Sequence, residues 1–159
     1  MKYNLSIKII ETALPKNNIK ISSLKKKNPT WDIKKIIAKT GIEKIWYTKK
    51  NQTALDLAFE ASKKVLKKTN KKSIDTLIYV TQSPEYFLPT TACILQHKLG
   101  LNNNVKAFDI NLGCSGFVYA LFLASSLIQN NLSKNILIVC ADTYSKYIDS
   151  SDRTNKTIF

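Results

Sequence analysis

The chain has 159 residues but only four glycines, four prolines and one histidine. It contains no Gly-x-Gly-x-x-Gly fingerprint and no phosphate-binding loop, so the motifs of dinucleotide and nucleoside-triphosphate enzymes are absent. The one histidine, His97, lies between Gln96 and Lys98 in a predicted helix, where we expect it to be exposed. A cysteine protease needs a histidine to activate its thiol, and the sequence does not predict such a pair.

Cysteine and arginine are also scarce. The three cysteines, Cys93, Cys114 and Cys140, are far apart in apolar segments, which argues against a disulfide framework and against zinc-ligand spacing. We therefore predict no metal site. The chain has one arginine against 24 lysines. Because arginine forks and interleaved aromatic platforms are missing, nucleic acid is not an expected partner.

Long apolar runs are missing as well. The longest nearly apolar run, residues 117–128, is too short to span a bilayer, and no signal peptide precedes the first predicted strand. We expect no membrane partner and a reducing, cytoplasmic compartment. The run predicts instead a helix that is buried on nearly all sides.

Positive charge is abundant and unevenly distributed. The net charge is +14, and residues 1–72 hold 19 lysines against five acidic residues, whereas residues 73–159 are balanced. A cationic half of this kind could steer an acidic partner, such as an acidic carrier protein. Alternatively, the abundance of lysine, asparagine and isoleucine reflects a biased genome composition. The sequence leaves both interpretations open.

Predicted strands and helices alternate along the chain. A capping box of Thr53 and Asp56 opens one helix, Thr30 is a candidate cap for an earlier helix that Gly41 closes, and Gly100 ends a third. Alternation of this kind predicts an α/β fold with a largely parallel sheet covered on both faces. The predicted strands are residues 3–10, 74–81, 105–110 and 135–141, and the later helices are 53–65, 91–99 and 115–129.

The end of the chain reads as the start of another strand. Residues 157–159 are β-prone, with no helix after them to cover the sheet. We expect the chain to be one part of a larger protein. The alternative is a short edge strand that ends the domain.

The segment 107–121 is the most informative part of the sequence. It places Cys114 at a turn between an apolar strand and an apolar helix, with Gly113 and Gly116 close by. A helix N-terminus offers unpaired N–H groups and a positive dipole end, which can lower a thiol pKa and create a covalent nucleophile. The alternative is a buried structural cysteine. The elbow of α/β hydrolases is not matched, because Leu112 stands where that motif has glycine.

These residues carry a resemblance to the N-terminal half of 3-oxoacyl-[acyl-carrier-protein] synthase III, a ketosynthase of the thiolase fold. The resemblance implies that residues 1–159 form one N-terminal thiolase-like half-domain and that the C-terminal half is absent. It implies a mixed, mostly parallel sheet with helices on both faces and a buried central helix. The segments that carry it are 107–110, 114–117 and 119–121, supported by 40–42, 88–93 and 152–154.

The resemblance also implies an activity, an acyl transfer in fatty-acid-type biosynthesis. Cys114 would accept a starter acyl group from a thioester for decarboxylative condensation with malonyl-acyl carrier protein, with its own backbone N–H in the oxyanion hole. Arg153 would hold the nucleotide end of coenzyme A, and Leu88 would reach across a dimer interface toward the acyl pocket. The implied substrates are coenzyme A or carrier-protein thioesters, with no permanently bound cofactor. The implied partners are acyl carrier protein and, at full length, a second copy.

The chain departs from the family pattern at several positions. Lys35 stands where the family has a coenzyme-stacking tryptophan, and Trp31 lies one helical turn before Lys35. Glu43 and Ile45 stand where many members of the family have arginines. The acyl donor, coenzyme A or carrier protein, is therefore left open. The family's condensing histidine and asparagine are missing, so we expect residues 1–159 alone not to condense. The alternatives are a thiolase-fold acyltransferase that acts without decarboxylation and an inactive, truncated structural or interaction unit.

Overall fold

The computed structural model describes residues 5–149. The chain divides into two compact units. Unit 1 comprises Met1–Ala13 and Thr53–Asp142, and unit 2 comprises Leu14–Gln52 and Thr143–Phe159. The candidate nucleophile Cys114 belongs to unit 1.

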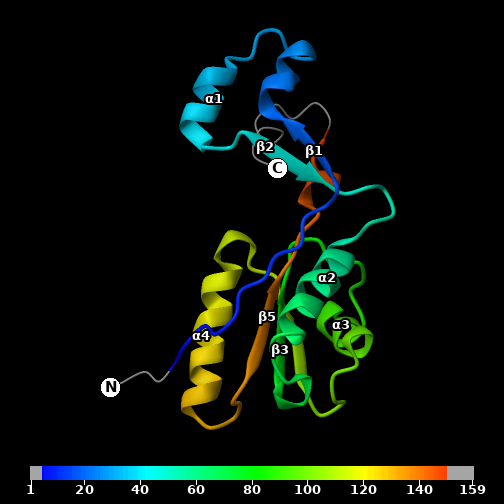
Figure 1. The fold of residues 1–159 in the computed structure, drawn as a ribbon, viewed down its shortest axis with the longest axis vertical. Helices are drawn as coiled ribbons and strands as arrows, with labels where there is room; N and C mark the ends of the chain where they lie inside the picture. Colours follow the sequence, from blue (N-terminus) through cyan, green and yellow to red (C-terminus); the bar gives the residue numbers. More distant parts are fainter. Residues whose placement is uncertain (1–4, 150–159) are drawn as a thin grey trace. The chain divides into compact units, whose positions relative to one another are not determined.

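Unit 1 is built on a three-stranded parallel sheet (Figure 1). The central strand β3 (Thr76–Val80) pairs with β4 (Lys106–Ile110) on one side and with β5 (Ile136–Cys140) on the other. All five residues of β3 are buried, as expected for a central parallel strand covered on both faces. The predicted strands at 74–81, 105–110 and 135–141 are therefore confirmed.

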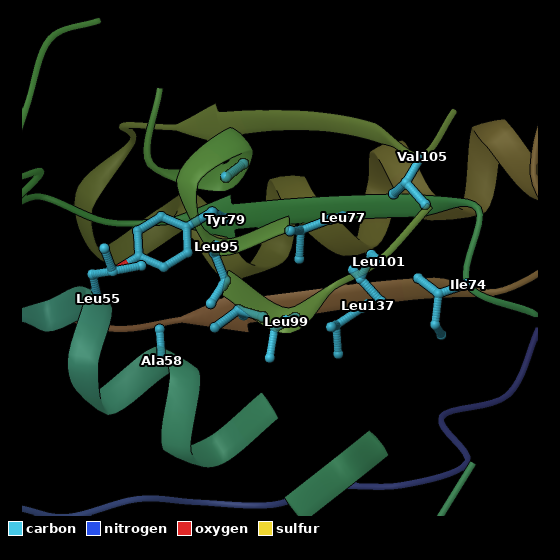
Figure 2. Close-up of a cluster of buried hydrophobic side chains, with 12 residues drawn as sticks. Leu55, Ala58, Ile74, Leu77, Tyr79, Leu95, Leu99, Leu101, Val105 and Leu137 are labelled. Carbon is cyan, nitrogen blue, oxygen red and sulfur yellow. The ribbon is translucent and has the colours of Figure 1, made fainter. Parts of the chain in front are cut away.

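Helices cover both faces of this sheet, as predicted. Helices α2 (Ala54–Leu66) and α3 (Thr91–Leu99) pack on one face, and α4 (Gly116–Gln129) packs on the other. Alternate residues of β3 enter the two cores, since successive strand side chains point to opposite faces. The first core, shown in Figure 2, includes Leu55, Ala58, Leu77, Tyr79, Leu95, Leu99 and Leu137. The second includes Ile78, Val80, Ile110, Ala120 and Ala124.

The predicted helix boundaries in unit 1 are set by local chemistry. Thr53 and Asp56 form the full capping box of α2, each side chain accepting from the other's backbone N–H. Helix α3 ends at Gly100, which adopts a left-handed φ of 60°. Both features were predicted from the sequence and are confirmed.

Helix α4 differs from the prediction in its burial. Only Gly116, Ala120 and Ala124 of this helix are buried. They are four residues apart and therefore lie on one side of the helix, the side that faces the sheet. The expectation of a central helix buried on nearly all sides is wrong for this structure, because α4 has the sheet on one side and nothing among residues 5–149 covers the other. Its exposed apolar residues, between 46% and 68% accessible, are Phe117, Val118, Tyr119 and Phe122. Within residues 5–149, no helix has both the length and the apolarity needed to cross a membrane.

The strand predicted at residues 3–10 is also not found over its described part. Residues 5–10 have no regular secondary structure, and Ile7 and Ile10 are exposed. An alternating pattern makes a strand only where another strand offers hydrogen-bonding partners. The two residues after this segment are held instead by lysines: Lys64 Nζ of α2 donates to the Thr12 carbonyl at 2.6 Å, and Lys68, just beyond α2, forms an ion pair with Glu11.

Unit 2 contains a two-stranded antiparallel ribbon that the sequence analysis missed. Strand β1 (Asn17–Lys20) pairs with β2 (Lys44–Tyr47), and α1 (Ile33–Thr40) lies between them in sequence. Strands of four residues carry too little periodicity to be recognised. Within residues 5–149, the short 3₁₀ helices are Ile21–Lys26, Lys71–Ser73, Gly113–Ser115 and Tyr144–Lys146.

Helix α1 begins two residues later than predicted. Asp32, not Thr30, caps it, by accepting a hydrogen bond from the Lys35 backbone N–H at 3.1 Å. It ends at Gly41 with φ 68°, as predicted. Its apolar side joins a small core around Ile21, Trp31 and Ile33.

Candidate active site around Cys114

Cys114 lies where β4 gives way to α4. It is the middle residue of the 3₁₀ turn Gly113–Ser115, it is exposed, and its thiol is free. The predicted position between a strand and a helix is confirmed. The alternative of a buried structural cysteine does not hold, since the residue is open to solvent. Ligands of parallel α/β sheets bind at the carboxyl ends of the strands, which is the edge that Cys114 occupies.

Two glycines make this turn possible. Gly113 adopts a φ of 56°, in the left-handed region that residues with a Cβ rarely enter. Gly116 lies so close to the central strand that a Cβ there would be 2.5 Å from Val80 Cγ1. Ser115 Oγ donates to the Leu112 carbonyl at 2.9 Å and closes the turn. The position of Cys114 thus depends on contact between the start of α4 and β3.

Asp142 organises the loop that follows β3. Its Oδ1 accepts hydrogen bonds from Thr81 Oγ1 at 3.0 Å, from the Gln82 backbone N–H at 2.7 Å and from Ser83 Oγ at 3.0 Å. Asn111 Nδ2 donates to the Thr81 carbonyl at 3.1 Å. The segments after β3, β4 and β5 are therefore tied to one another beside the cysteine turn.

The Gln82 side chain extends from this loop toward the cysteine turn. Its Oε1 lies 3.3 Å from the point where a Cβ on Gly113 would be. Gln82 is exposed, and a carboxamide can both donate and accept hydrogen bonds. Gln82 is therefore the polar side chain placed next to the residue that precedes Cys114, and the sequence analysis did not single it out.

Asp109, near the end of β4, holds the start of α3. Its two carboxylate oxygens accept from the Thr91 and Ala92 backbone N–H groups at 2.8 and 2.7 Å, while the Thr90 side chain makes no capping bond. An anion at a helix N-terminus is favoured by the unpaired N–H groups and the dipole. The sequence offered no local signal for this contact, because the partners are 17 and 18 residues apart.

A third carboxylate holds the start of α2. Glu85 Oε1 accepts from the Leu55 backbone N–H at 2.9 Å. Burial raises the pKa of the Tyr79 hydroxyl far above its usual range, and the charges of Glu85, Asp142 and Asp109 raise it further. The Tyr79 hydroxyl therefore stays neutral. The three carboxylates each accept hydrogen bonds from a different segment of the chain and so join the elements of unit 1.

The other predicted site residues are not brought to Cys114 by the described structure. Leu88 lies on the loop after β3 and is 85% exposed, beside Phe87, which is 99% exposed. Arg153 lies outside the described residues. In unit 2, Trp31 is 9% exposed and packs in the core with Ile33, whereas Lys35 is exposed.

The remaining cysteines and the histidine are set apart from Cys114 by their surroundings. Cys93 and Cys140 are free and exposed, and His97 is exposed as expected. Partial burial, together with the Asp142 charge, raises the pKa of the Cys140 thiol. Across residues 5–149, no three histidine, cysteine or acidic side chains gather as metal ligands would.

Comparison with known proteins finds a family match around Cys114. Residues 108–159, which include Cys114, match the family model described as 3-oxoacyl-[acyl-carrier-protein (ACP)] synthase III. The beta-ketoacyl-[acyl-carrier-protein] synthase III of Neisseria gonorrhoeae is 38% identical over 148 residues, which cover 92% of this chain and 46% of that protein.

Solved structures agree with the sequence match. A crystal structure of a 3-oxoacyl-(acyl-carrier-protein) synthase III has a TM-score of 0.88 and 40% identity, over 94% of this chain and 45% of the other. The 3-oxoacyl-[acyl-carrier-protein] synthase III of Aquifex aeolicus has a TM-score of 0.85 and 36% identity, over 96% of this chain and 50% of the other. The chain thus spans about half the length of the relatives it matches. Over that length it is similar to the N-terminal-side half of 3-oxoacyl-[acyl-carrier-protein] synthase III proteins and shares their thiolase-like α/β fold.

Proposed function

We propose that this chain is the nucleophile-bearing part of a cytoplasmic ketosynthase of fatty-acid-type biosynthesis. In this proposal, Cys114 accepts a starter acyl group from a coenzyme A or carrier-protein thioester. The observation that carries the proposal is the exposed thiol at the start of α4, inside the segment that the family model matches. Acyl carrier protein is the proposed partner.

The first step is an acyl transfer to sulfur. The Cys114 thiolate attacks the thioester carbonyl, a tetrahedral oxyanion forms, and its collapse expels the donor as a thiolate. Backbone N–H groups at the cysteine turn, including that of Cys114, are proposed to hold the oxyanion. One donor of this kind is typically worth about 3 kcal/mol of barrier height. The 14-residue helix α4 adds the positive end of its dipole.

The second step joins two carbon chains. Malonyl-acyl carrier protein loses carbon dioxide, and the resulting carbanion attacks the acyl-cysteine carbonyl. This forms the carbon–carbon bond and returns the electron pair to the Cys114 sulfur. Decarboxylation needs side-chain donors that we assign to the rest of the family's length, so residues 1–159 alone are expected not to condense.

Two further roles belong to the proposal. Leu88 is assigned to a dimer interface near the acyl pocket, and its wide exposure on the loop after β3 supports this assignment. Arg153 is assigned to the nucleotide end of coenzyme A, on the resemblance alone.

Intact-mass measurement tests the proposed nucleophile directly. The full-length gene product is mixed with acetyl-coenzyme A or acetyl-carrier protein, and a single acetyl adduct on the Cys114 peptide is expected. Cys93→Ala and Cys140→Ala are matched controls that keep the adduct, whereas Cys114→Ala loses it. An adduct that survives Cys114→Ala contradicts the proposal.

Carbon dioxide release separates the proposed reaction from simpler acyl transfer. With labelled malonyl-acyl carrier protein, the acylated full-length protein is expected to release one carbon dioxide for each 3-oxoacyl product. Acyl transfer to an alcohol or amine without that release identifies a non-decarboxylating acyltransferase and overturns the condensation step.

A further inference from the structure

The amino edge of the sheet in unit 1 carries a cluster of lysines. The segments that lead into the three parallel strands meet at this edge, where α2 and α4 also end (Figure 1). Asp75, just before β3, joins them, because its N–H donates to the Asn135 carbonyl and its carbonyl accepts from the Lys106 N–H, both at 3.1 Å. Five exposed lysines belong to these segments. We call the following set the amino-edge lysines: Lys67, Lys71, Lys72, Lys106 and Lys134.

Acidic side chains do not balance this charge. The three segments, residues 67–75, 100–106 and 130–135, contain one acidic residue, Asp75. Its Oδ2 is already engaged by the Lys134 backbone N–H at 2.6 Å. Across the described part of the chain, no ion pair includes an amino-edge lysine. One carboxylate against five ammonium groups leaves the edge strongly positive.

The opposite, carboxyl edge of the same sheet has the reverse character. Residues 81–90, 111–115 and 141–143 follow strands β3, β4 and β5 and contain no lysine. The carboxylates of Glu85 and Asp142 lie there instead. A biased genome composition would enrich lysine at both edges, so it does not account for this difference. The asymmetry favours an anionic partner for the amino edge.

One exposed apolar side chain lies among the amino-edge lysines. Leu132 is 58% exposed, its carbonyl accepts from Lys106 Nζ at 2.8 Å, and Lys134 follows two residues later. Lys71 Nζ donates to the Leu99 carbonyl at the end of α3, at 3.2 Å. These bonds hold two of the charges at the edge, while both lysines stay exposed. An apolar side chain beside cations is the combination with which peripheral proteins enter the headgroup region of a bilayer.

We propose that the amino edge of unit 1 binds the surface of an anionic lipid bilayer, with the amino-edge lysines on phosphate headgroups and Leu132 in the interface. Protein interfaces are depleted in lysine and depend on aromatic and arginine anchors, and nucleic-acid sites use arginine and aromatic platforms. The three segments contain neither arginine nor an aromatic residue. A bilayer needs only several lysines near its anionic lipids, each contributing about fivefold in binding.

This binding mode needs no spanning helix. The sequence-based expectation of no membrane partner rested on the lack of a long apolar run, and surface binding does not require one. The inference is also independent of the proposed acyl transfer, because Cys114 lies at the opposite edge of the sheet.

Co-sedimentation of the full-length gene product with vesicles tests the proposal. Vesicles of phosphatidylglycerol and phosphatidylcholine in equal parts are expected to bind the protein, whereas vesicles of phosphatidylcholine alone are not. Raising salt from 50 to about 300 mM is expected to weaken binding at least tenfold, because screening weakens contacts between exposed charges. Inorganic phosphate at equal ionic strength is expected not to displace the protein. Failure to bind the anionic vesicles, or equal binding to the neutral ones, overturns the proposal.

Matched variants separate this surface from general charge attraction. Lys67→Gln, Lys72→Gln and Lys134→Gln together are expected to weaken vesicle binding at least thirtyfold and to leave the melting temperature unchanged, because each lysine contributes about fivefold. The control, Lys25→Gln with Lys26→Gln and Lys27→Gln, removes the same charge from unit 2 and is expected to change binding less than threefold. Leu132→Ser is expected to weaken binding without changing its salt dependence.

Two results of these measurements would overturn the proposal. Equal losses in the two triple variants would show that net charge, not the amino edge, attracts the vesicles. Polyglutamate that binds the protein more tightly than the anionic vesicles, and loses that binding in the Lys67, Lys72 and Lys134 variant, would identify an acidic protein as the partner of this edge.

Discussion

At the scale of single residues, Gly116 is the glycine with the least room for a side chain. A methyl group added there would lie 2.5 Å from Val80 Cγ1, a residue of the fully buried central strand. Alanine normally stabilises a helix relative to glycine, so any loss of stability in this variant comes from the clash. Gly116 therefore fixes how closely the start of α4, and with it Cys114, approaches the sheet.

Gly116→Ala is expected to lower the free energy of unfolding by about 1–3 kcal/mol, as overpacking of a core does. Urea denaturation followed by circular dichroism measures this change. Ser126→Ala, at an exposed position of the same helix, is the control and is expected to change stability by less than about 0.5 kcal/mol. Equal stability of Gly116→Ala and wild type would mean that α4 does not contact β3 as described.

Cys140 offers a prediction on pH. Its folded pKa is raised by burial and by Asp142, so folding favours the neutral thiol. Stability from this group is complete below the unfolded thiol pKa, about 8.5, and is lost as pH rises above it. In a Cys93→Ser, Cys114→Ser background, half-maximal alkylation of Cys140 by iodoacetamide is expected at a higher pH in the folded chain than in the urea-unfolded chain. Adding Asp142→Asn is expected to lower the folded midpoint. A folded midpoint equal to or below the unfolded one, before that change, contradicts the assignment.

At the scale of elements, unit 1 is held together by carboxylates that cap helices from other segments. Asp109 caps α3 from strand β4, and Glu85 caps α2 from the loop after β3. Each contact joins parts of the chain that are distant in sequence. The arrangement fixes the loops at the carboxyl edge of the sheet, where Cys114 lies.

Asp109→Ala is expected to destabilise the chain by about 2–3 kcal/mol, because two charge-assisted hydrogen bonds to the start of α3 are lost. Thr90→Ala is the matched control. Thr90 occupies the cap position but makes no side-chain hydrogen bond, so its replacement is expected to cost less than about 0.5 kcal/mol. A larger loss of stability for Thr90→Ala than for Asp109→Ala, in thermal or urea unfolding, would show that Thr90 and not Asp109 caps the helix.

The elements that could be predicted from the sequence are those with strong local signals. The Thr53 capping box and Gly100 gave the boundaries of α2 and α3, and apolar runs gave the parallel strands. The predictions that failed did so for different reasons. The alternating residues 5–10 found no strand to pair with, the four-residue strands β1 and β2 were too short to recognise, and Asp32 displaced Thr30 as a cap.

The candidate site shows the same division. Cys114 between its glycines could be found because its signal is local, lying within a few residues of sequence. Gln82 and Asp142 could not be found, because they approach the cysteine turn only through the order of strands in the sheet. The burial of α4 was overestimated because apolar composition alone does not say which side meets a neighbour.

At the scale of the whole molecule, the chain spans about half the length of its relatives, and α4 presents an apolar side to solvent. Replacement of Phe122, which is 68% exposed, is therefore expected to cost little in residues 1–159. Phe122→Ser is expected to change the free energy of unfolding by less than about 1 kcal/mol, compared with about 2–5 kcal/mol for the buried Leu95→Ala. A large loss in Phe122→Ser would mean that this side of α4 is covered.

The most direct measurement of the central claim is the stoichiometry of acyl transfer to sulfur in the full-length gene product. After incubation with an acetyl thioester and denaturation, peptide mass spectrometry is expected to find one acetyl group per chain, on Cys114, with Cys93 and Cys140 unmodified. Acetyl groups distributed over all three cysteines, or none on Cys114, would contradict the account.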